Sequence, residues 1–256
     1  MIDLHFHLLA GIDDGPGTVE QSLALARAAC AGGVREIVAT PHVSWEHDNR
    51  AATIAELTRV LSARVAAEGI ELRVRSGAEV ALTRAGELSD EELSALALGG
   101  AGGEWLLVEC PFTPAGRGFD TLLLALQRRG YRVLIAHPER CPAFHRDPEM
   151  LRSLVGAGML TSITAGSLVG RFGGTVRRFT EELVREQLVH NVVSDAHDLV
   201  RRPPGMTAEL AQAGLGELAQ WLTVEVPGAI LAGEEFPVRP AKARVGGALR
   251  RALRSR

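Results

Sequence analysis

"MIDLHFHLLAGIDDGPGT" (residues 1–18) places two histidines, His5 and His7, ahead of two adjacent aspartates, Asp13 and Asp14. Side chains at alternating positions of a β-strand point to the same face, so an extended segment here sets both imidazoles side by side. Two convergent imidazoles favour a metal ligand pair, and ordinary surface or core histidines are the alternative. Polar residues elsewhere in the chain decide between the two.

Six further apolar segments have the length and composition of β-strands: residues 36–42, 72–80, 105–110, 131–140, 159–167 and 190–198. Helical patterns lie between most of them: residues 18–33, 51–69, 119–130, 147–158 and 174–187. Several of these patterns end at a glycine, a common helix stop. Strands that alternate with helices predict βα units and a largely parallel sheet. No segment has the character of a linker, so we expect one domain over residues 1–238.

The composition is that of an ordinary globular protein, with 46% hydrophobic and 23% charged residues. The formal net charge of -3 gives no general signal for nucleic acid or an anionic membrane. No apolar run approaches the roughly 18 residues of a membrane span, and the N-terminus lacks the basic and apolar regions of a signal peptide. We therefore expect a cytoplasmic protein with no membrane span and no nucleic-acid partner.

The last part of the chain, residues 239–256, differs in character because it holds seven basic residues and no acidic one. We expect a solvated basic C-terminal tail beyond the domain. A docking surface for an acidic partner or a membrane face is the less favoured alternative.

The three cysteines, Cys30, Cys110 and Cys141, are widely separated, which favours reduced thiols over a disulfide framework. A cysteine-based tyrosine phosphatase needs a nucleophilic cysteine in a C-x5-R loop that wraps the phosphate. Cys30 and Cys141 are each followed by an arginine at the fifth position, and Cys110 at the seventh. The spacing therefore excludes thiol catalysis of this type.

Residues able to bind metals recur at the carboxyl ends of the predicted strands. His5 and His7 close the first strand, and Asp14 follows in its loop. The later strands end in, or are followed by, the other candidates: His42, Glu79, Glu109, His137, Asp195 and His197. The carboxyl ends of parallel strands emerge on one face of a barrel, so nine such side chains converge there. Unrelated polar residues are the less favoured alternative, because buried strand ends seldom collect so many without a metal.

The size of this set predicts two or three divalent metal ions, since each ion takes about four to six ligands and a carboxylate can bridge two. Mixed nitrogen and oxygen ligands without thiolate favour Mn, Fe or Zn over Mg or Ca. Clustered metals activate water and neutralise charge in phosphate ester hydrolysis. Asp13 and Asp14 are adjacent, and the sequence alone allows them to exchange roles.

Two arginines follow the candidate ligands in the predicted loops. Arg140 lies three residues after His137, and Arg202 lies five after His197. A guanidinium group matches phosphate oxygens with two parallel hydrogen bonds, which suits both residues to binding a phosphoryl group. Exposed surface arginine is the alternative.

The motifs "HFH", "DDGP", "ATPH", "GAE", "VEC", "AHPER", "SDAH" and "RPP" occur in an order and spacing that resembles a known superfamily. They resemble the polymerase and histidinol phosphatase (PHP) superfamily, and more narrowly its bacterial protein-tyrosine phosphatases encoded with capsular and exopolysaccharide genes. The resemblance runs from Met1 to about Pro204. It implies a distorted (β/α)7 barrel with a trinuclear metal site, often manganese or iron, with zinc also open.

The resemblance also implies roles for individual residues. The ligand positions fall on nine residues: His5, His7, Asp14, His42, Glu79, Glu109, His137, Asp195 and His197. Arg140 and Arg202 take the phosphate-contacting positions. Apart from the resemblance, a metal-bound water, Asp14 or His42 is the expected donor if the leaving group is protonated. The implied substrate is phosphotyrosine on a cognate bacterial tyrosine kinase that controls polysaccharide synthesis.

This sequence departs from its relatives around the substrate rim. Cys141 stands where they often have an aromatic residue after "HPER", and the segment "VALTRAGEL" after Glu79 lacks the tyrosines common there. Two alternatives therefore stay open. A small-molecule phosphoesterase such as a histidinol-phosphate phosphatase shares every metal ligand. A non-catalytic regulatory binding module is disfavoured because all nine positions hold competent side chains.

Overall fold

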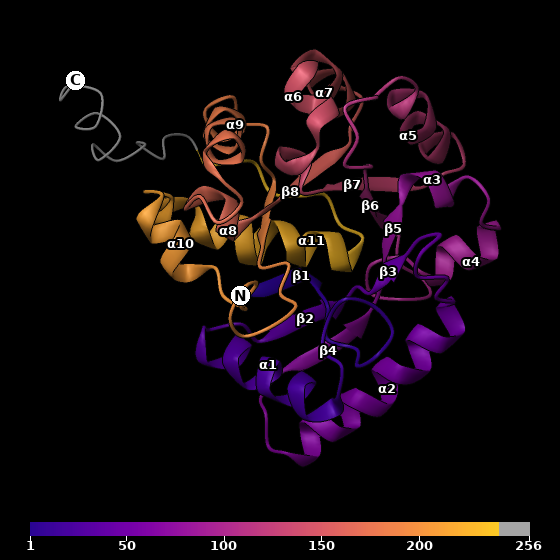
Figure 1. The fold of residues 1–256 in the computed structure, drawn as a ribbon, viewed down its shortest axis with the longest axis vertical. Helices are drawn as coiled ribbons and strands as arrows, with labels where there is room; N and C mark the ends of the chain where they lie inside the picture. The colour runs from indigo at the N-terminus through magenta and orange to yellow at the C-terminus, as the bar shows by residue number, and fades with distance from the viewer. Residues whose placement is uncertain (241–256) are drawn as a thin grey trace.

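The computed structural model describes residues 1–240 (Figure 1). Residues 241–256 lie outside the described part, and with them most of the basic tail predicted over residues 239–256. Arg239 is the exception: its guanidinium donates to the Val189 carbonyl at 3.2 Å and lies over the Trp221 ring.

The strands form two sheets in which every pairing is parallel. The smaller sheet has the order β1-β2-β4: β1 (Ile2–Phe6), β2 (Glu36–Ala39) and β4 (Arg73–Ser76). The larger sheet has the order β3-β5-β6-β7-β8-β9: β3 (His42–Val43), β5 (Glu79–Ala81), β6 (Trp105–Glu109), β7 (Arg132–Ala136), β8 (Leu160–Thr164) and β9 (Asn191–Val193). The predicted α/β class with parallel strands is confirmed.

Two predicted strands, residues 36–42 and 72–80, are each broken into two short ones, so the prediction of continuous strands there is wrong. The first breaks at Pro41, which has no backbone N–H to donate to a neighbouring strand. The second breaks at Gly77, where a Cβ atom would lie 2.6 Å from the Val38 Cγ1 atom. Each broken strand leaves the smaller sheet and enters the larger one.

The far edges of the two sheets also meet. The Asp195 N–H donates to the His5 carbonyl and the His7 N–H to the Ala196 carbonyl, both at 3.0 Å. Phe6 and Ala196 form an isolated parallel bridge. If β2 with β3, and β4 with β5, are each counted as one strand, neighbouring strands follow chain order from β1 to β9. The contacts of Asp195 and Ala196 then connect the segment after β9 to β1.

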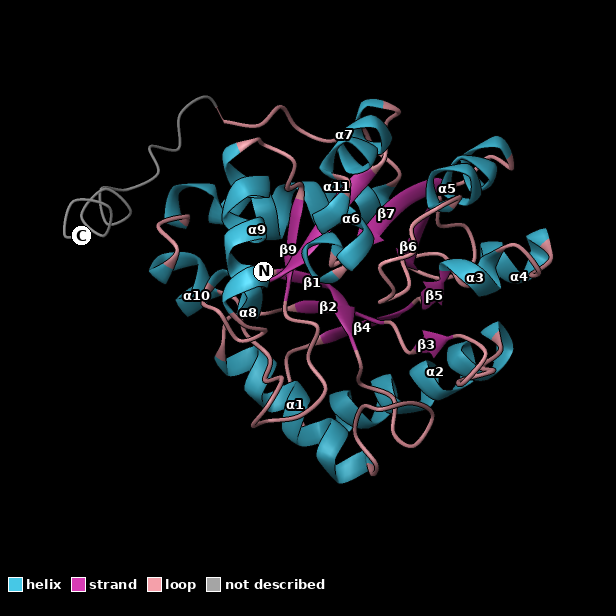
Figure 2. Cartoon of the chain, turned by 45° about the horizontal axis from the view of Figure 1, so that its top comes forward, coloured by secondary structure: helices cyan, strands magenta, loops and turns pink. Residues whose placement is uncertain are grey.

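Five helices match the predicted ones: α1 (Val19–Ala31), α2 (Ala51–Ala67), α5 (Phe119–Arg128), α7 (Pro148–Gly156) and α9 (Gly174–Arg185). The others were not predicted: α3 (Leu82–Ala85), α4 (Asp90–Ala95), α6 (Pro142–Arg146), α8 (Ala165–Leu168), α10 (Thr207–Gln212), α11 (Val226–Ala232) and helical turns at Pro138–Arg140, Gly216–Leu218 and Trp221–Glu225. Figure 2 shows the helices surrounding the strands. Over residues 1–240, none is long and apolar enough to cross a membrane.

The core lies between the strands and this surrounding layer of helices. Leu4 of β1, Leu107 of β6 and Leu134 of β7 are fully buried in it. Polar side chains are buried together at one end of the strands, among them His5 in β1, Glu79 at the start of β5 and Asp195 after β9. Buried polar groups cost free energy unless they are paired, so this concentration marks the functional site.

Candidate metal centre

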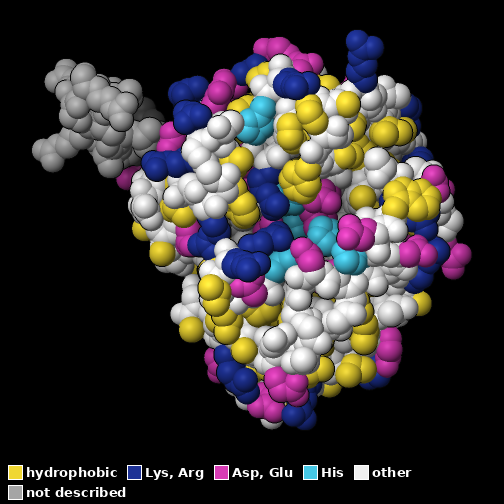
Figure 3. Space-filling model, in the orientation of Figure 1, with side chains coloured by type: hydrophobic (Ala, Val, Ile, Leu, Met, Phe, Trp, Pro, Cys, Tyr) yellow, Lys and Arg dark blue, Asp and Glu magenta, His cyan; other side chains and the backbone are white. Residues whose placement is uncertain are grey.

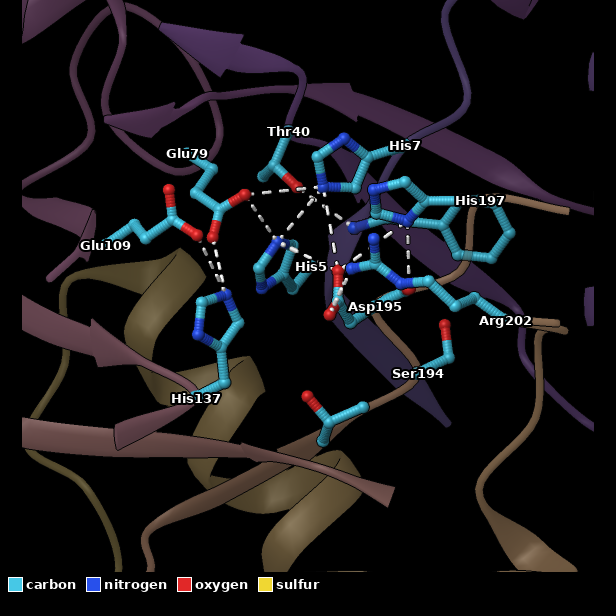
Figure 4. A network of polar contacts seen from close by, with 12 residues as sticks. His5, His7, Thr40, Glu79, Glu109, His137, Ser194, Asp195, His197 and Arg202 are labelled. Atoms are coloured by element: carbon cyan, nitrogen blue, oxygen red, sulfur yellow. Dashed lines mark hydrogen bonds and ion pairs between the residues drawn. The ribbon is translucent and has the colours of Figure 1, made fainter. Parts of the chain in front are cut away.

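The nine predicted ligand residues meet in one cluster. Figure 4 shows most of them: His5, His7, Glu79, Glu109, His137, Asp195 and His197. Their ligand atoms form four overlapping groups in which all atoms lie within 4.8 Å of one another: His7, Asp14, His42 and His197; His5, Glu79 and His137; His5, His7 and Asp195; His42, Glu79 and Glu109. Each residue belongs to at least one group, and several belong to two. The structure thus brings together every residue that the sequence nominated as a ligand.

Glu79, the first residue of β5, is at the centre of the cluster. Its Oε2 atom lies 3.1 Å from His5 Nε2, 3.4 Å from His7 Nε2 and 3.0 Å from His42 Nδ1. Its Oε1 atom lies 2.7 Å from His137 Nε2. One fully buried carboxylate therefore faces four imidazoles that come from the ends of three strands, β1, β3 and β7, as a bridging ligand would.

Asp195, just beyond β9, joins the histidines to the arginines. Its Oδ1 atom lies 3.4 Å from His5 Nε2 and 3.6 Å from His7 Nε2. Its Oδ2 atom accepts from Arg140 Nη1 at 2.8 Å and lies 2.5 Å from Arg202 Nη2. Within residues 1–240, the buried Oδ1 atom accepts no hydrogen bond. A buried anionic oxygen without a donor is costly, and a metal ion would satisfy it.

Asp14 lies at the open edge of the cluster, and Asp13 lies behind it. Asp14 Oδ1 is 3.0 Å from His197 Nε2 and 3.4 Å from His42 Nε2, and its side chain is 51% exposed. Asp13 Oδ2 instead lies 2.8 Å from His7 Nδ1 and accepts from the His42 backbone N–H at 3.2 Å. The geometry places Asp14 in the cluster and gives Asp13 the role of orienting His7.

Electrostatic interactions with neighbouring carboxylates stabilise the protonated forms of His7 and His42. Burial opposes a charge on His7, yet its hydrogen bonds with Asp13 and Glu79 raise the pKa of this imidazole to about 10. Burial also opposes a charge on His42, and there Glu79 and Asp14 raise the pKa to about 9. Without metal ions, protons on these rings therefore balance the carboxylates. Metal ions would displace them, since ligating imidazoles are neutral.

Two other groups are held in their neutral forms. Burial, together with the charge of Glu79, raises the pKa of Glu109 to about 8. Burial and the neighbouring Arg140 charge lower the pKa of His137 to about 4. A neutral His137 imidazole needs to lose no proton before binding a cation.

Backbone strain is concentrated in the same place. Among the residues that the structure describes, three non-glycine residues have positive φ, and two of them are His137 (28°) and Asp195 (53°). Such conformations cost free energy and are typical of functional sites. Here they turn the chain sharply after β7 and near the end of β9, which directs both side chains into the cluster.

Two buried acids that the sequence analysis did not select support these turns. Asp3 accepts from the backbone N–H of Ser194 at 3.2 Å, and its burial raises its pKa to about 6. Glu139 accepts from the Thr164 backbone N–H at 2.9 Å and from Ser167 Oγ at 2.7 Å. Both lie within two residues of a predicted ligand, and that proximity was the only signal in the sequence.

The cluster opens onto the surface rather than into an enclosed pocket. In Figure 3, histidine, acidic and basic side chains are visible together in a hollow on one face. Exposed apolar side chains follow the strand ends in sequence: Trp45, Phe112, Leu199 and Val200. A pocket of about 260 Å³ adjoins Asp14, His197 and Leu199. The site is therefore accessible to a group carried on a larger molecule.

A protein family described as "Capsular polysaccharide synthesis, CpsB/CapC" matches residues 1–221 of this sequence. The chain belongs to the CpsB/CapC family. Tyrosine-protein phosphatase YwqE of Bacillus subtilis is 37% identical to this CpsB/CapC member over 203 residues, 79% of each chain. Tyrosine-protein phosphatase CpsB of Streptococcus pneumoniae is 31% identical over 216 residues, covering 80% of this chain and 86% of that one. The predicted resemblance to the capsular branch is confirmed.

A solved structure from work on YwqE and CpsB, there called unique metal-dependent tyrosine phosphatases, superimposes on this CpsB/CapC member with a TM-score of 0.81. The two are 33% identical, and the match covers 94% of this chain and 100% of that chain. A β-aspartyl dipeptidase from Fervidobacterium islandicum matches with a TM-score of 0.54 at 14% identity, over 90% of this chain and 72% of that one. The second similarity concerns the fold alone.

Proposed function

We propose that this chain is a metal-dependent protein-tyrosine phosphatase. The observation that carries the proposal is the cluster of five imidazoles and four carboxylates with two guanidinium groups hydrogen-bonded or ion-paired to one of its carboxylates. Metal ligands and phosphate-binding cations are the two components that phosphate monoester hydrolysis requires. The names of the relatives YwqE and CpsB support phosphotyrosine as the ester.

The nine clustered residues would hold two or three divalent ions, with Mn or Fe favoured and Zn possible on ligand chemistry. The orphaned Asp195 Oδ1 atom and the central position of Glu79 fit such ions. When bound, the ions would supply activation of water and neutralisation of the charge on the phosphoryl group.

Arg140 and Arg202 would bind the phosphoryl oxygens. Both guanidinium groups approach Asp195 Oδ2, and Arg202 Nη1 also lies 3.6 Å from Asp14 Oδ2, so the carboxylates hold them in place. Preorganised cations of this kind stabilise charge that develops in the transition state. A departing phenolate, with a pKa of about 10, needs little help from a proton donor. As metal ligands, Asp14 and His42 would hold no proton to give, so we propose a water molecule beside them at the open edge as the donor.

The open rim favours a phosphotyrosine carried on a protein over a small free substrate. We propose a cognate bacterial tyrosine kinase of capsular or exopolysaccharide synthesis as the phosphoprotein. Rates of phosphate release from a phosphotyrosine peptide and from histidinol phosphate, measured side by side, test this choice. A higher kcat/KM for the peptide is expected, and a preference for histidinol phosphate would replace the proposal with the small-molecule alternative.

Chelation of metals is expected to lower the rate of phosphotyrosine hydrolysis by about a hundredfold or more, because no side chain in the cluster replaces the activating ions. Adding Mn²⁺ after removal of the chelator is expected to restore the rate. The measurement is phosphate release alongside the metal content by mass spectrometry. Protein dialysed in parallel without chelator is the control, and full activity in metal-free protein would refute a metal mechanism.

Cys141→Ser is expected to leave kcat/KM within about twofold of the wild-type value, because a buried thiol with a raised pKa is a poor nucleophile. The Sγ atom lies 3.7 Å from the Pro111 carbonyl and takes part in none of the candidate metal groups. Steady-state kinetics on a phosphotyrosine peptide is the measurement, with Cys30→Ser as the matched control. A large loss specific to Cys141→Ser would reinstate thiol catalysis.

A further inference from the structure

One large aromatic side chain lies exposed beside the phosphate-binding arginine. Phe112 follows β6 by three residues and is 50% exposed. Its ring is nearly parallel to that of His137, with centroids 5.6 Å apart and an interplanar angle of 18°. The Arg140 guanidinium carbon lies 5.0 Å from the centre of the same phenyl ring. The Phe112 ring thus contacts both a candidate ligand and a candidate phosphate-binding group, while half of its surface stays free.

The position of Arg140 fixes where a substrate ring has to lie. Its guanidinium is restrained by Asp195 and by two aromatic rings, those of Phe112 and Phe172, the latter 4.5 Å away. In phosphotyrosine, a single ester oxygen separates the phosphorus atom from the phenyl ring. A phosphoryl group on Arg140 therefore leaves the substrate ring close to the free surface of Phe112. Aromatic rings attract one another in offset-stacked and edge-to-face arrangements.

The opposite side of the site is less suited to an aryl phosphate. There, the pocket lined by Pro16, Leu25 and Leu199 carries the carboxylates of Asp14 and Asp198, and its lining includes no phenylalanine, tyrosine or tryptophan ring. The Phe112 side instead offers an aromatic ring directly beside Arg140.

We propose that Phe112 binds the phenyl ring of phosphotyrosine and selects aryl over alkyl phosphates. This inference rests on the proposed phosphatase function and adds a substrate contact to it. It also explains how the substrate rim keeps an aromatic contact although this chain has Cys141 after "HPER": the ring comes from the loop after β6 instead.

The test compares two non-hydrolysable ligands, phenylphosphonate and methylphosphonate, which share the phosphonate and differ in the ring. Their dissociation constants are measured by calorimetry on the Mn²⁺-loaded wild-type protein and on Phe112→Ala. We expect the substitution to lower the preference for phenylphosphonate by about tenfold, the value of one aromatic contact. Phe112→Tyr, which retains the ring, is expected to keep the wild-type preference. Phe112→Leu keeps apolar bulk and replaces the alanine variant if that one does not fold.

Phe172→Ala is the matched control, because Phe172 also contacts Arg140. It is expected to weaken both ligands alike and to leave their ratio unchanged. Equal weakening of both ligands by Phe112→Ala would reduce Phe112 to a support for Arg140 and overturn the inference. A ratio that changes in Leu199→Ala and not in Phe112→Ala would move the ring to the pocket beside Asp14 and overturn it as well. Wild-type hydrolysis of a phosphotyrosine peptide is measured separately, and its absence would instead count against the proposed function.

Discussion

Replacing Glu79 with glutamine is expected to lower kcat/KM for a phosphotyrosine peptide by about a thousandfold and to reduce the number of bound metal ions. Both Glu79 oxygens face imidazoles, with Oε1 near His137 and Oε2 near His5, His7 and His42. Glutamine preserves the size of the side chain but removes the negative charge that two neighbouring metal ions would share. Steady-state kinetics and metal analysis of the purified variant measure the two effects.

Glu56→Gln is the matched control, because Glu56 is an exposed helix residue paired with Arg59. It is expected to change neither activity nor metal content, since exposed ion pairs contribute little to stability. Circular dichroism verifies that Glu79→Gln is folded. Full activity and a full complement of metal in folded Glu79→Gln would show that the Glu79 charge is not needed to bind the metal ions.

Replacing Arg202 with lysine is expected to lower kcat/KM by about a hundredfold, the usual cost of losing one preorganised donor to the transition state. Lysine keeps the positive charge but offers a single ammonium in place of the planar guanidinium that approaches both Asp195 and Asp14. The metal ligands stay in place, so the metal content is expected to stay at the wild-type value.

Arg201→Lys is the control for this experiment. Arg201 adjoins Arg202 in the chain, but its side chain is exposed and forms no ion pair with the cluster in the described structure. We expect this variant to keep wild-type kinetics. Equal losses in the two variants, or a loss of metal in Arg202→Lys, would contradict a direct role for Arg202 in phosphate binding.

The candidate site could be predicted from the sequence because its residues recur at one place in a repeated pattern. His5, Glu109, His137 and Asp195 each lie at or near the end of an apolar segment, and parallel strands carry such ends to one face. Neither this spacing nor the resemblance identified the rim. Phe112 lies in a loop without periodicity, and its contact with Arg140 depends on the fold of distant segments.

The breaks in the second and third predicted strands could not be predicted from local composition. An apolar run continues through residues 36–39 to Pro41, and only the partner strand reveals that the chain changes sheets there. At Gly77, the cause is the approach of Val38 from another segment. Pro41 is visible in the sequence, but the change of sheet at both breaks depends on tertiary contacts, which a periodicity along one segment does not contain.

Two supporting acids, Asp3 and Glu139, were missed for a related reason, and Asp13 was considered only as an alternative to Asp14. Asp3, Asp13 and Glu139 are chemically equivalent to ligands, and each lies within two residues of one in the sequence. They differ from the ligands in their partners: Asp13 contacts His7 and accepts from the His42 backbone N–H, whereas Asp3 and Glu139 accept from the backbone N–H groups of Ser194 and Thr164. Which carboxylate faces the cluster and which faces the backbone is decided by the turn geometry of the folded chain.

The bonds that join the first strand to the segment after β9 have a consequence for the order of events in the cell. Ribosomes synthesise a chain from its N-terminus, so His5 and His7 emerge well before Asp195 and His197 exist. Two of the four ligand groups combine His5 or His7 with Asp195 or His197, so neither group is complete before the later residues have been synthesised. A full metal centre would therefore form only after Asp195 and His197 have been synthesised, and a nascent chain without them has no complete site.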